Sequence, residues 1–287
     1  ERFSKIPDGD AKLELIDPDS AVQRVAVREG VRLSAVPNPF NDTYSLELRF
    51  GVGTDAMREL WVAPDFVSRL GTAKHSAEGF KKQLFLLGTT YSSWATEDEL
   101  VVRLEGPEGK LGAALALLDE RLRAPKADKK TWKRFKRERR GMDKVMRRDP
   151  DERARAALDY VTLGKNSDYL RDYGKKGVRK LSPKGLIAKW KQAQGYGVEV
   201  EYAGKQSPQA VADALREQLS FAPTLRPRTP KVVYPRIEAS ANRVFFLPKK
   251  NELQSRIYFH VEGDAVPREQ QYVADAYRYY LGGSMAG

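Results

Sequence analysis

Residues 43–50 narrow the choice of fold further than any other stretch, because they alternate strictly between polar and apolar side chains. The apolar members are Tyr44, Leu46, Leu48 and Phe50. Successive side chains of a strand point to opposite faces, so this pattern predicts a strand with one buried face. Two earlier alternating stretches, 22–27 and 31–36, predict a hairpin in the same sheet. The buried face of such a sheet needs a covering layer of helices.

Most of the chain up to Leu219 supplies that layer and completes the sheet. Apolar residues at helical spacing predict a helix over 56–70, although Pro64 must lie near its start or kink it. Three further helices are predicted to begin after the capping serines Ser76, Ser182 and Ser207. Other helices are predicted over 111–122, 129–148 and 153–163. Further strands are predicted over 89–95, 100–104 and 198–202. This order predicts an α+β layer fold with a mixed, largely antiparallel sheet covered by helices.

A proline-rich stretch follows, with Pro223, Pro227, Pro230 and Pro235. We expect a linker here, and beyond it two strands over 244–247 and 257–261 and a helix over 270–281. The predicted domains are an N-terminal extension (1–20), a complete α+β repeat (21–220), the linker (221–240) and the start of a second, truncated repeat (241–287). A tail this short buries little core alone, so it must pack on the first domain, pair with another chain or continue in a longer parent protein. We favour a longer parent protein.

The net charge of +12 is concentrated in one predicted helix, 129–148, which holds eleven lysines and arginines and two acidic residues. Its apolar residues recur at offsets that place them on one helical face: Trp132, Phe135, Met142, Val145 and Met146. Its opposite face carries a basic patch: Lys133, Arg134, Lys136, Arg137 and Arg140. A solvated helix surface is the favoured interpretation. A surface that binds nucleic acid is one alternative, and a surface that binds an acidic polypeptide or a partner domain is another.

Residue types exclude several functions. The chain has no cysteine, which rules out disulfides, a thiol nucleophile and cysteine-based metal sites. Its two histidines, His75 and His260, fall in different predicted domains, so a shared metal site is not the favoured interpretation. No apolar run is long enough to span a bilayer and no targeting signal is visible, which leaves the location open.

Several short motifs occur in an order that resembles the insulinase/pitrilysin family of zinc metallopeptidases. They are Asn-Pro-Phe-Asn-Asp at 38–42, Gly-Thr at 71–72, Ser-Ala-Glu-Gly-Phe at 76–80 and Leu-Gly at 87–88. The strand over 198–203, the proline-rich linker, Gln254 and the Leu-Gly-Gly-Ser-Met at 281–285 continue the likeness, which covers 21–287. The resemblance implies an insulinase/processing-peptidase-like repeat.

The main departure concerns the zinc motif. Active members of the family resemble inverzincins, with H-x-x-E-H on the helix before the Gly-Thr pair. Here the corresponding positions hold Val62, Asp65 and Phe66. Valine and phenylalanine cannot ligate zinc, and Asp65 would have no metal-bound water to activate. The resemblance therefore implies the inactive half of the family, with no catalytic residue and no cofactor in this chain and with zinc in the catalytic half.

The same resemblance implies the partners. We expect a catalytic metallopeptidase half, on the same parent chain or as a separate subunit, and a peptide substrate held in the chamber between the halves. Gln254, Tyr258 and His260 are candidate chamber residues, with a plain core strand as the alternative interpretation. The resemblance favours a periplasmic or secreted location. The competing hypothesis is a nucleic-acid-binding or partner-binding module that uses the basic helix 129–148.

Overall fold

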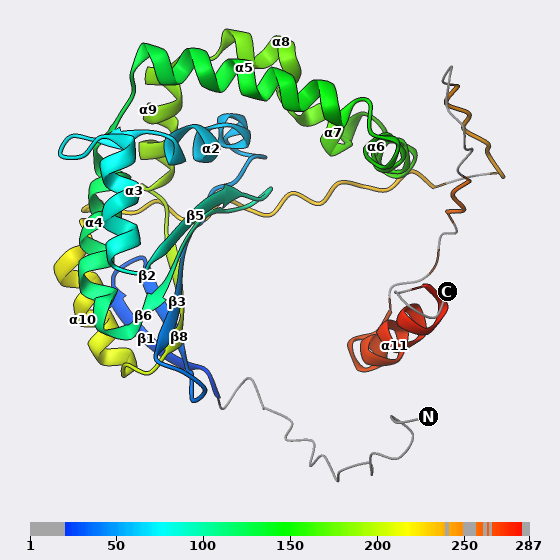
Figure 1. Cartoon of the computed structure of the whole chain (residues 1–287). Helices are drawn as coiled ribbons and strands as arrows, with labels where there is room; N and C mark the ends of the chain where they lie inside the picture. Colours follow the sequence, from blue (N-terminus) through cyan, green and yellow to red (C-terminus); the bar gives the residue numbers. More distant parts are fainter. Residues whose placement is uncertain (1–20, 239–240, 249–256, 261–262, 264–265, 283–287) are drawn as a thin grey trace, which may run out of the picture. The chain divides into compact units, whose positions relative to one another are not determined.

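The computed structural model describes residues 21–238, 241–248, 257–260, 263 and 266–282. The chain divides into two compact units, unit 1 (Glu1–Ile237) and unit 2 (Glu238–Gly287). Figure 1 shows the chain coloured along the sequence, with the sheet and most of the helices in unit 1.

Unit 1 is built on a six-stranded sheet with the strand order β1-β2-β8-β3-β6-β5. Its strands are β1 (Gln23–Arg28), β2 (Val31–Pro37), β3 (Thr43–Phe50), β5 (Thr90–Ala95), β6 (Leu100–Pro107) and β8 (Val198–Gly204). Only the β2–β8 pair among these strands is parallel, and the other neighbours are antiparallel. The predicted hairpin is β1–β2, and Gly30 turns it with a φ of 75° that a residue with a side chain rarely adopts. The mixed, largely antiparallel sheet is confirmed.

Unit 1 also contains helices that pack beside this sheet. They are η2 (Arg58–Trp61), α2 (Ala63–Ser68), α3 (Ala77–Leu86), α4 (Leu111–Arg123), α5 (Lys129–Met146), α6 (Pro150–Leu163), α7 (Asp168–Arg171), α8 (Gly174–Lys180), α9 (Pro183–Ala193) and α10 (Pro208–Gln218). Two short strands, β4 (Gly71–Thr72) and β7 (Pro125–Lys126), pair antiparallel. The predicted helix over 56–70 is divided at Val62, and Pro64 lies at the start of its second part because proline fits only the first helical turn.

The serine caps form as predicted. The hydroxyl oxygens of Ser76, Ser182 and Ser207 accept from the backbone N–H groups of Gly79, Gly185 and Ala210, at 3.0, 3.1 and 3.2 Å. Each bond satisfies a donor that the first helical turn leaves without a partner. These caps fix where α3, α9 and α10 begin.

The core lies on one face of the sheet. There α10 packs on β1 and β2, α4 on β6 and α3 on β5, so that α3, α4 and α10 form a layer beside the strands (Figure 1). Leu46 and Leu48 of β3 and Leu115 of α4 are fully buried in this layer. Burial of each such side chain stabilises the fold by about 1.5–3 kcal/mol. No described helix of unit 1 packs on the opposite face of the sheet, which we call the open sheet face.

The proline-rich stretch up to Ile237 lies against the rest of unit 1, and we call residues 221–237 the strap. Its backbone is hydrogen-bonded to unit 1 at Arg226 (to Gly195 and Gly197), Thr229 (to Gly51) and Ile237 (to Thr162), each at 2.8 Å. The Tyr234 hydroxyl donates to the Asp55 carboxylate at 2.8 Å. The strap is therefore attached to the surface of unit 1 along its length.

In unit 2, the predicted helix over 270–281 is α11 (Gln271–Gly282). The predicted strands over 244–247 and 257–261 are wrong for the residues described, since 244–247 and 257–260 have no regular secondary structure. Alternating apolar residues form a strand only beside another strand that completes the hydrogen-bond ladder, and unit 2 has no strand in its described part. In the described residues of either unit, no helix is both long and apolar enough to cross a membrane.

Candidate functional site

Two of the three zinc-motif positions belong to the hydrophobic core. The Val62 and Phe66 side chains are 0% exposed. The Phe66 ring meets the Trp132 ring edge-on at 5.0 Å and the Phe135 ring at 5.2 Å between centroids. These rings join α2 to α5 through an aromatic cluster. The space at position 66 is therefore filled by packed carbon atoms.

The third position, Asp65, lies on the solvent side of α2. Its carboxylate forms ion pairs with Arg69 at 3.0 Å and with Arg139 at 3.9 Å. In the part of the chain that the structure describes, no three or more His, Cys, Asp or Glu residues are grouped so that they could hold a metal ion. The residues at the motif positions do not fit zinc, because two have no donor atom and the third is neutralised by arginines.

The open sheet face carries the most extensive charge network of the sheet. It is formed by Glu47 and Arg49 of β3, Trp94 of β5, Arg103 and Glu105 of β6, and Glu199 and Glu201 of β8. Strand register places Glu47 directly between Arg103 and Glu201. These residues lie on the polar side of strands whose apolar side faces the helices.

Arg49 lies at the centre of this network. Its guanidinium forms ion pairs with Glu99 at 2.7 Å, Glu47 at 2.9 Å and Glu201 at 3.1 Å. Burial lowers the pKa of Arg49, but the hydrogen bond to Glu99 and the nearby carboxylates outweigh burial, and the net pKa is raised. Arg49 is thus a fixed positive charge surrounded by carboxylates.

Arg103 extends the network toward the sheet edge. Its Nε donates to the Glu47 carboxylate at 2.6 Å, and its guanidinium lies 5.7 Å from the centre of the Trp94 ring. Arg103, Glu105 and Glu201 keep about half of their side-chain surface exposed. The open sheet face therefore offers solvent-accessible charged groups and an aromatic ring that an extended polypeptide could contact.

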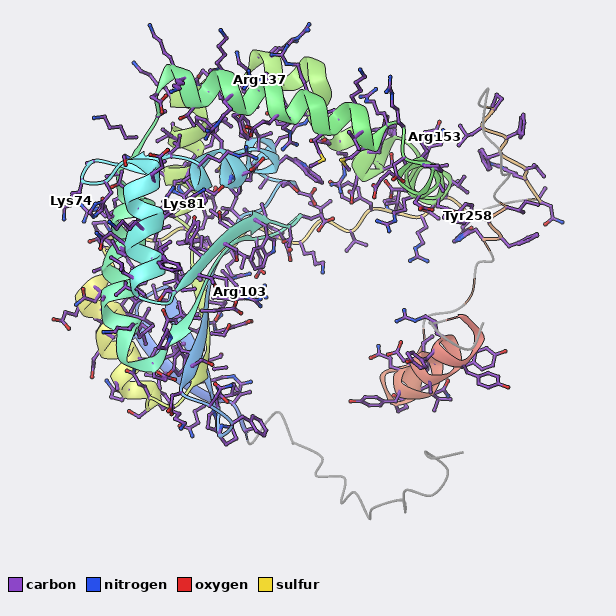
Figure 2. All side chains as sticks on the ribbon, in the orientation of Figure 1. Lys74, Lys81, Arg103, Arg137, Arg153 and Tyr258 are labelled. Carbon is purple, nitrogen blue, oxygen red and sulfur yellow. The ribbon has the colours of Figure 1, made fainter. Side chains whose placement is uncertain are left out.

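The predicted basic patch lies on α5. Lys133, Arg134, Arg137 and Arg140 are exposed, and Arg137 points away from the sheet in Figure 2. Lys136 is only half-exposed, because its ammonium group lies over the Trp132 ring at 5.1 Å. The exposed cations meet the electrostatic requirement of a surface for acidic partners.

The apolar face predicted for α5 is only half correct. Phe135 is buried, but Met142, Val145 and Met146 are 60, 64 and 45% exposed. The first half of α5 rests on the aromatic cluster with Phe66, while the second half has no comparable apolar layer against it among the described residues. Helical spacing predicts which side chains share a face and leaves open whether another element covers that face.

The predicted chamber residues belong to unit 2, whereas the zinc-motif positions belong to unit 1. Tyr258 and His260 are exposed residues of unit 2, in a stretch without regular structure. Gln254 lies outside the described residues. The network on the open sheet face was not predicted from the sequence. The polar residues that alternate with apolar ones along the strands are the sequence feature that indicates a charged sheet face. Which of these residues lie next to one another depends on how the strands pair.

No protein-family model matches this sequence, and a search of curated proteins found no match. Solved structures do share its fold. A mutant of the ferredoxin protease FusC, in complex with Arabidopsis ferredoxin, matches with a TM-score of 0.64 and 14% identity over 78% of this chain and 25% of that chain. The peptidase M16 inactive domain from Pseudomonas fluorescens matches with a TM-score of 0.62 and 18% identity over 75% of this chain and 53% of that chain.

The first half of the periplasmic protease PqqL from Escherichia coli has a TM-score of 0.59 and 16% identity over 77% of this chain and 50% of that chain. This chain thus spans between a quarter and about half of the length of these structures. The resemblance to M16 peptidases, one of them an inactive domain, is confirmed at the level of the fold.

Proposed function

We propose that this chain is the non-catalytic half of a zinc metallopeptidase and supports a separate half that carries H-x-x-E-H. The observation that supports this proposal is that the zinc-motif positions of an M16-like fold hold residues that cannot bind zinc. Val62 and Phe66 are packed in the core and Asp65 is paired with arginines. Zinc would be held by the catalytic half, on the same parent chain or in a separate subunit.

The open sheet face is the surface that we propose for the peptide chamber. It is not covered by a described helix of its own unit, and it carries exposed charges beside the Trp94 ring. Such a surface suits an extended peptide, whose backbone is contacted by polar groups and whose side chains are contacted by the ring. Gln254, Tyr258 and His260 remain proposed chamber residues.

We also propose the domain division predicted above, with a complete repeat over 21–220 and the start of a second repeat over 241–287. The likeness of this chain to one half of longer peptidases supports it. A periplasmic or secreted location is a further proposal, and its support is the fold shared with a protease described as periplasmic. Fractionation of the native cells would test it.

The decisive experiment combines zinc analysis with cleavage of a quenched peptide. The chain alone is expected to bind no stoichiometric zinc and to cleave nothing, whereas a mixture with an H-x-x-E-H half encoded beside it cleaves the peptide. Chelator-sensitive cleavage by the chain alone would contradict the proposal. A mixture no more active than the catalytic half alone would also contradict it.

A matched pair of variants tests the surface. Arg103 lies on the open sheet face and Lys81 on the exposed side of α3 (Figure 2). In the assembled enzyme, Arg103→Ala is expected to raise KM for the peptide about tenfold, while Lys81→Ala leaves KM within about twofold. Both variants remove one cation, which is half-exposed and paired with Glu47 at Arg103 and fully exposed at Lys81, so equal effects would rule out a specific role for the open sheet face.

The exposed basic patch on α5 supports the second candidate function, a module that binds nucleic acid or an acidic partner through α5. Specific retention on nucleic acid at physiological salt would favour it. Loss of binding by about 0.2 M salt would indicate unspecific attraction of charges.

A further inference from the structure

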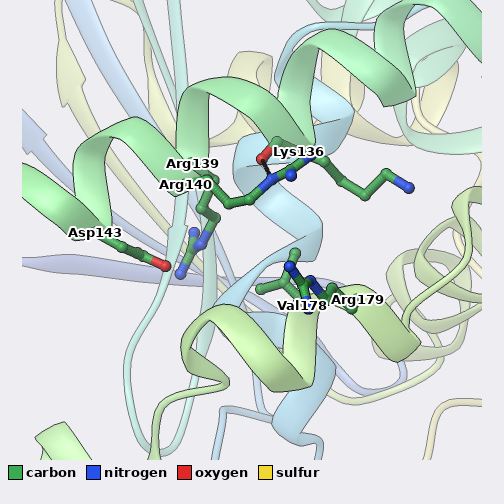
Figure 3. A pocket seen from close by; sticks show the side chains of 6 residues that line it. All are labelled: Lys136, Arg139, Arg140, Asp143, Val178 and Arg179. Carbon is green, nitrogen blue, oxygen red and sulfur yellow. Dashed lines mark hydrogen bonds between the residues drawn. The ribbon is translucent and has the colours of Figure 1, made fainter.

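A pocket with a volume of about 170 Å³ lies between α5 and α8. Figure 3 shows α8 beneath α5, with Val178 and Arg179 directed toward it. Its lining consists of four positively charged side chains, one carboxylate and one valine: Lys136, Arg139, Arg140, Arg179, Asp143 and Val178. A concave surface with this excess of positive charge concentrates anions, because its charges act on the same small volume.

Three of the four pocket cations, Lys136, Arg139 and Arg140, are held in place by contacts within the protein. Arg139 is paired with Asp172 at 3.5 Å and with Asp65 at 3.9 Å, and Lys136 lies over the Trp132 ring at 5.1 Å. The Arg140 Nε donates to the Lys136 carbonyl oxygen at 2.9 Å, which leaves its remaining N–H groups available. Within the described residues, Arg140 and Arg179 have no ion-pair partner. Side chains already held in position lose little conformational entropy when they bind a ligand.

We propose that this pocket binds a phosphate-type oxyanion. Cations from two helices surround the space, and a tetrahedral phosphate presents acceptor oxygens in several directions at once. A planar carboxylate has only two oxygens, which one arginine can satisfy. Guanidinium groups form charge-assisted hydrogen bonds with phosphate, and Lys136 adds a compact charge. Phosphate binding here is independent of the peptidase role proposed above.

Isothermal titration of the whole chain with inorganic phosphate, at constant ionic strength maintained with chloride, tests the site. We expect saturable binding to one site. The double variant Arg140→Gln/Arg179→Gln should weaken it about tenfold or more, because two charge-assisted hydrogen-bond donors are lost. The matched control Lys133→Gln/Arg137→Gln removes the same charge from exposed positions outside the pocket and should change the affinity less than about twofold.

A variant that binds phosphate more tightly than the wild type provides a control for misfolding, because a misfolded variant would not gain affinity. Asp143→Asn removes the only carboxylate of the lining and should tighten phosphate binding several-fold. Equal losses in the two double variants would overturn the proposal, as would phosphate heats no larger than those of chloride. Phosphoserine distinguishes the source of the group: binding at least as tight as that of phosphate indicates a phosphoryl group on a larger molecule, and weaker binding indicates free phosphate.

Discussion

At the scale of single residues, the side chains at the zinc-motif positions take part in packing and ion pairs instead of binding a metal. A metal site needs donor atoms that point into a shared space, whereas Phe66 contributes its ring to a cluster with Trp132 and Phe135. The contribution of Phe66 is therefore to the stability of the contact between α2 and α5. Histidines placed at positions 62 and 66 would have to displace this packing before they could reach a metal.

Phe66→Ala is expected to lower the free energy of unfolding by about 3–5 kcal/mol, because it leaves a cavity in a close-packed cluster. Urea denaturation followed by circular dichroism measures the loss. The control is Phe85→Ala on α3, where the phenylalanine is 81% exposed and the expected change is below about 0.5 kcal/mol. Similar losses in both variants would show that the cluster has no special role.

Tyr202 links pH to stability. Its hydroxyl donates to both oxygens of the Glu108 carboxylate, at 2.8 and 2.9 Å, and burial together with this carboxylate raises the pKa of Tyr202. A raised pKa in the folded state stabilises the protein below the unfolded pKa of about 10, and this contribution is lost as the pH rises further.

The stability advantage of the wild type over Tyr202→Phe should therefore be constant up to about pH 10 and then fall by about 1.4 kcal/mol per pH unit. Urea denaturation of both proteins between pH 7 and about pH 11 provides the comparison. Parallel profiles over the whole range would contradict this prediction.

At the scale of elements, the strap shows how a proline-rich segment becomes part of a folded unit. Proline removes backbone donors, yet the remaining N–H groups of Arg226, Thr229 and Ile237 find acceptors on unit 1. Arg228 adds an ion pair with Glu99, a residue that also binds Arg49. The strap thus connects to the network on the open sheet face.

Gly51 permits this close approach. A Cβ atom at position 51 would lie 2.7 Å from the Cβ and 3.0 Å from the Cα of Arg228. Gly51→Ala should push the strap away, lower the free energy of unfolding by about 1–3 kcal/mol and expose the strap to proteases.

A Cβ at Gly112 of α4 would meet nothing within 4 Å, so Gly112→Ala should stabilise the chain by up to about 1 kcal/mol. Limited proteolysis and urea denaturation measure both changes, and a tolerated Gly51→Ala would contradict the close contact.

At the scale of the whole molecule, unit 1 contains one continuous core, with a helical layer on one face of its sheet and charged groups on the other. The described residues of unit 2 contain one long helix, α11, with exposed tyrosines. A segment that buries as little surface as these described residues contributes little stability by itself. This difference between the units agrees with a chain that matches half of a longer peptidase.

Truncation tests the organisation of unit 1. Residues 21–237 are expected to unfold in a single cooperative transition, since the core residues that the structure describes all lie in unit 1. Residues 21–220 should be less stable by at least about 2 kcal/mol, because the strap and its Leu225, which packs against the core, are lost. Calorimetry of the two chains measures the difference. Equal stability would show that the strap contributes nothing to the fold.

Most elements of unit 1 could be predicted from the sequence, because their causes are local. The alternation over β3 and the serine caps of α3, α9 and α10 depend on residues a few positions apart. The zinc-motif positions could likewise be assessed by residue type alone. The strands predicted over 244–247 and 257–261 do not form among the residues described there, because a strand needs a neighbouring strand, which no local pattern supplies.

The sequence by itself determined the class of the fold, the positions of its caps and turns, and the absence of imidazoles at Val62 and Phe66. Only the tertiary structure placed β8 between β2 and β3, and with it brought Glu201 to Arg49. The pocket between α5 and α8 also arises only on folding. The physical reason is the distance along the chain over which each effect acts. Propensity and periodicity depend on residues a few positions apart, whereas charge networks and pockets depend on which distant segments pack together around the core.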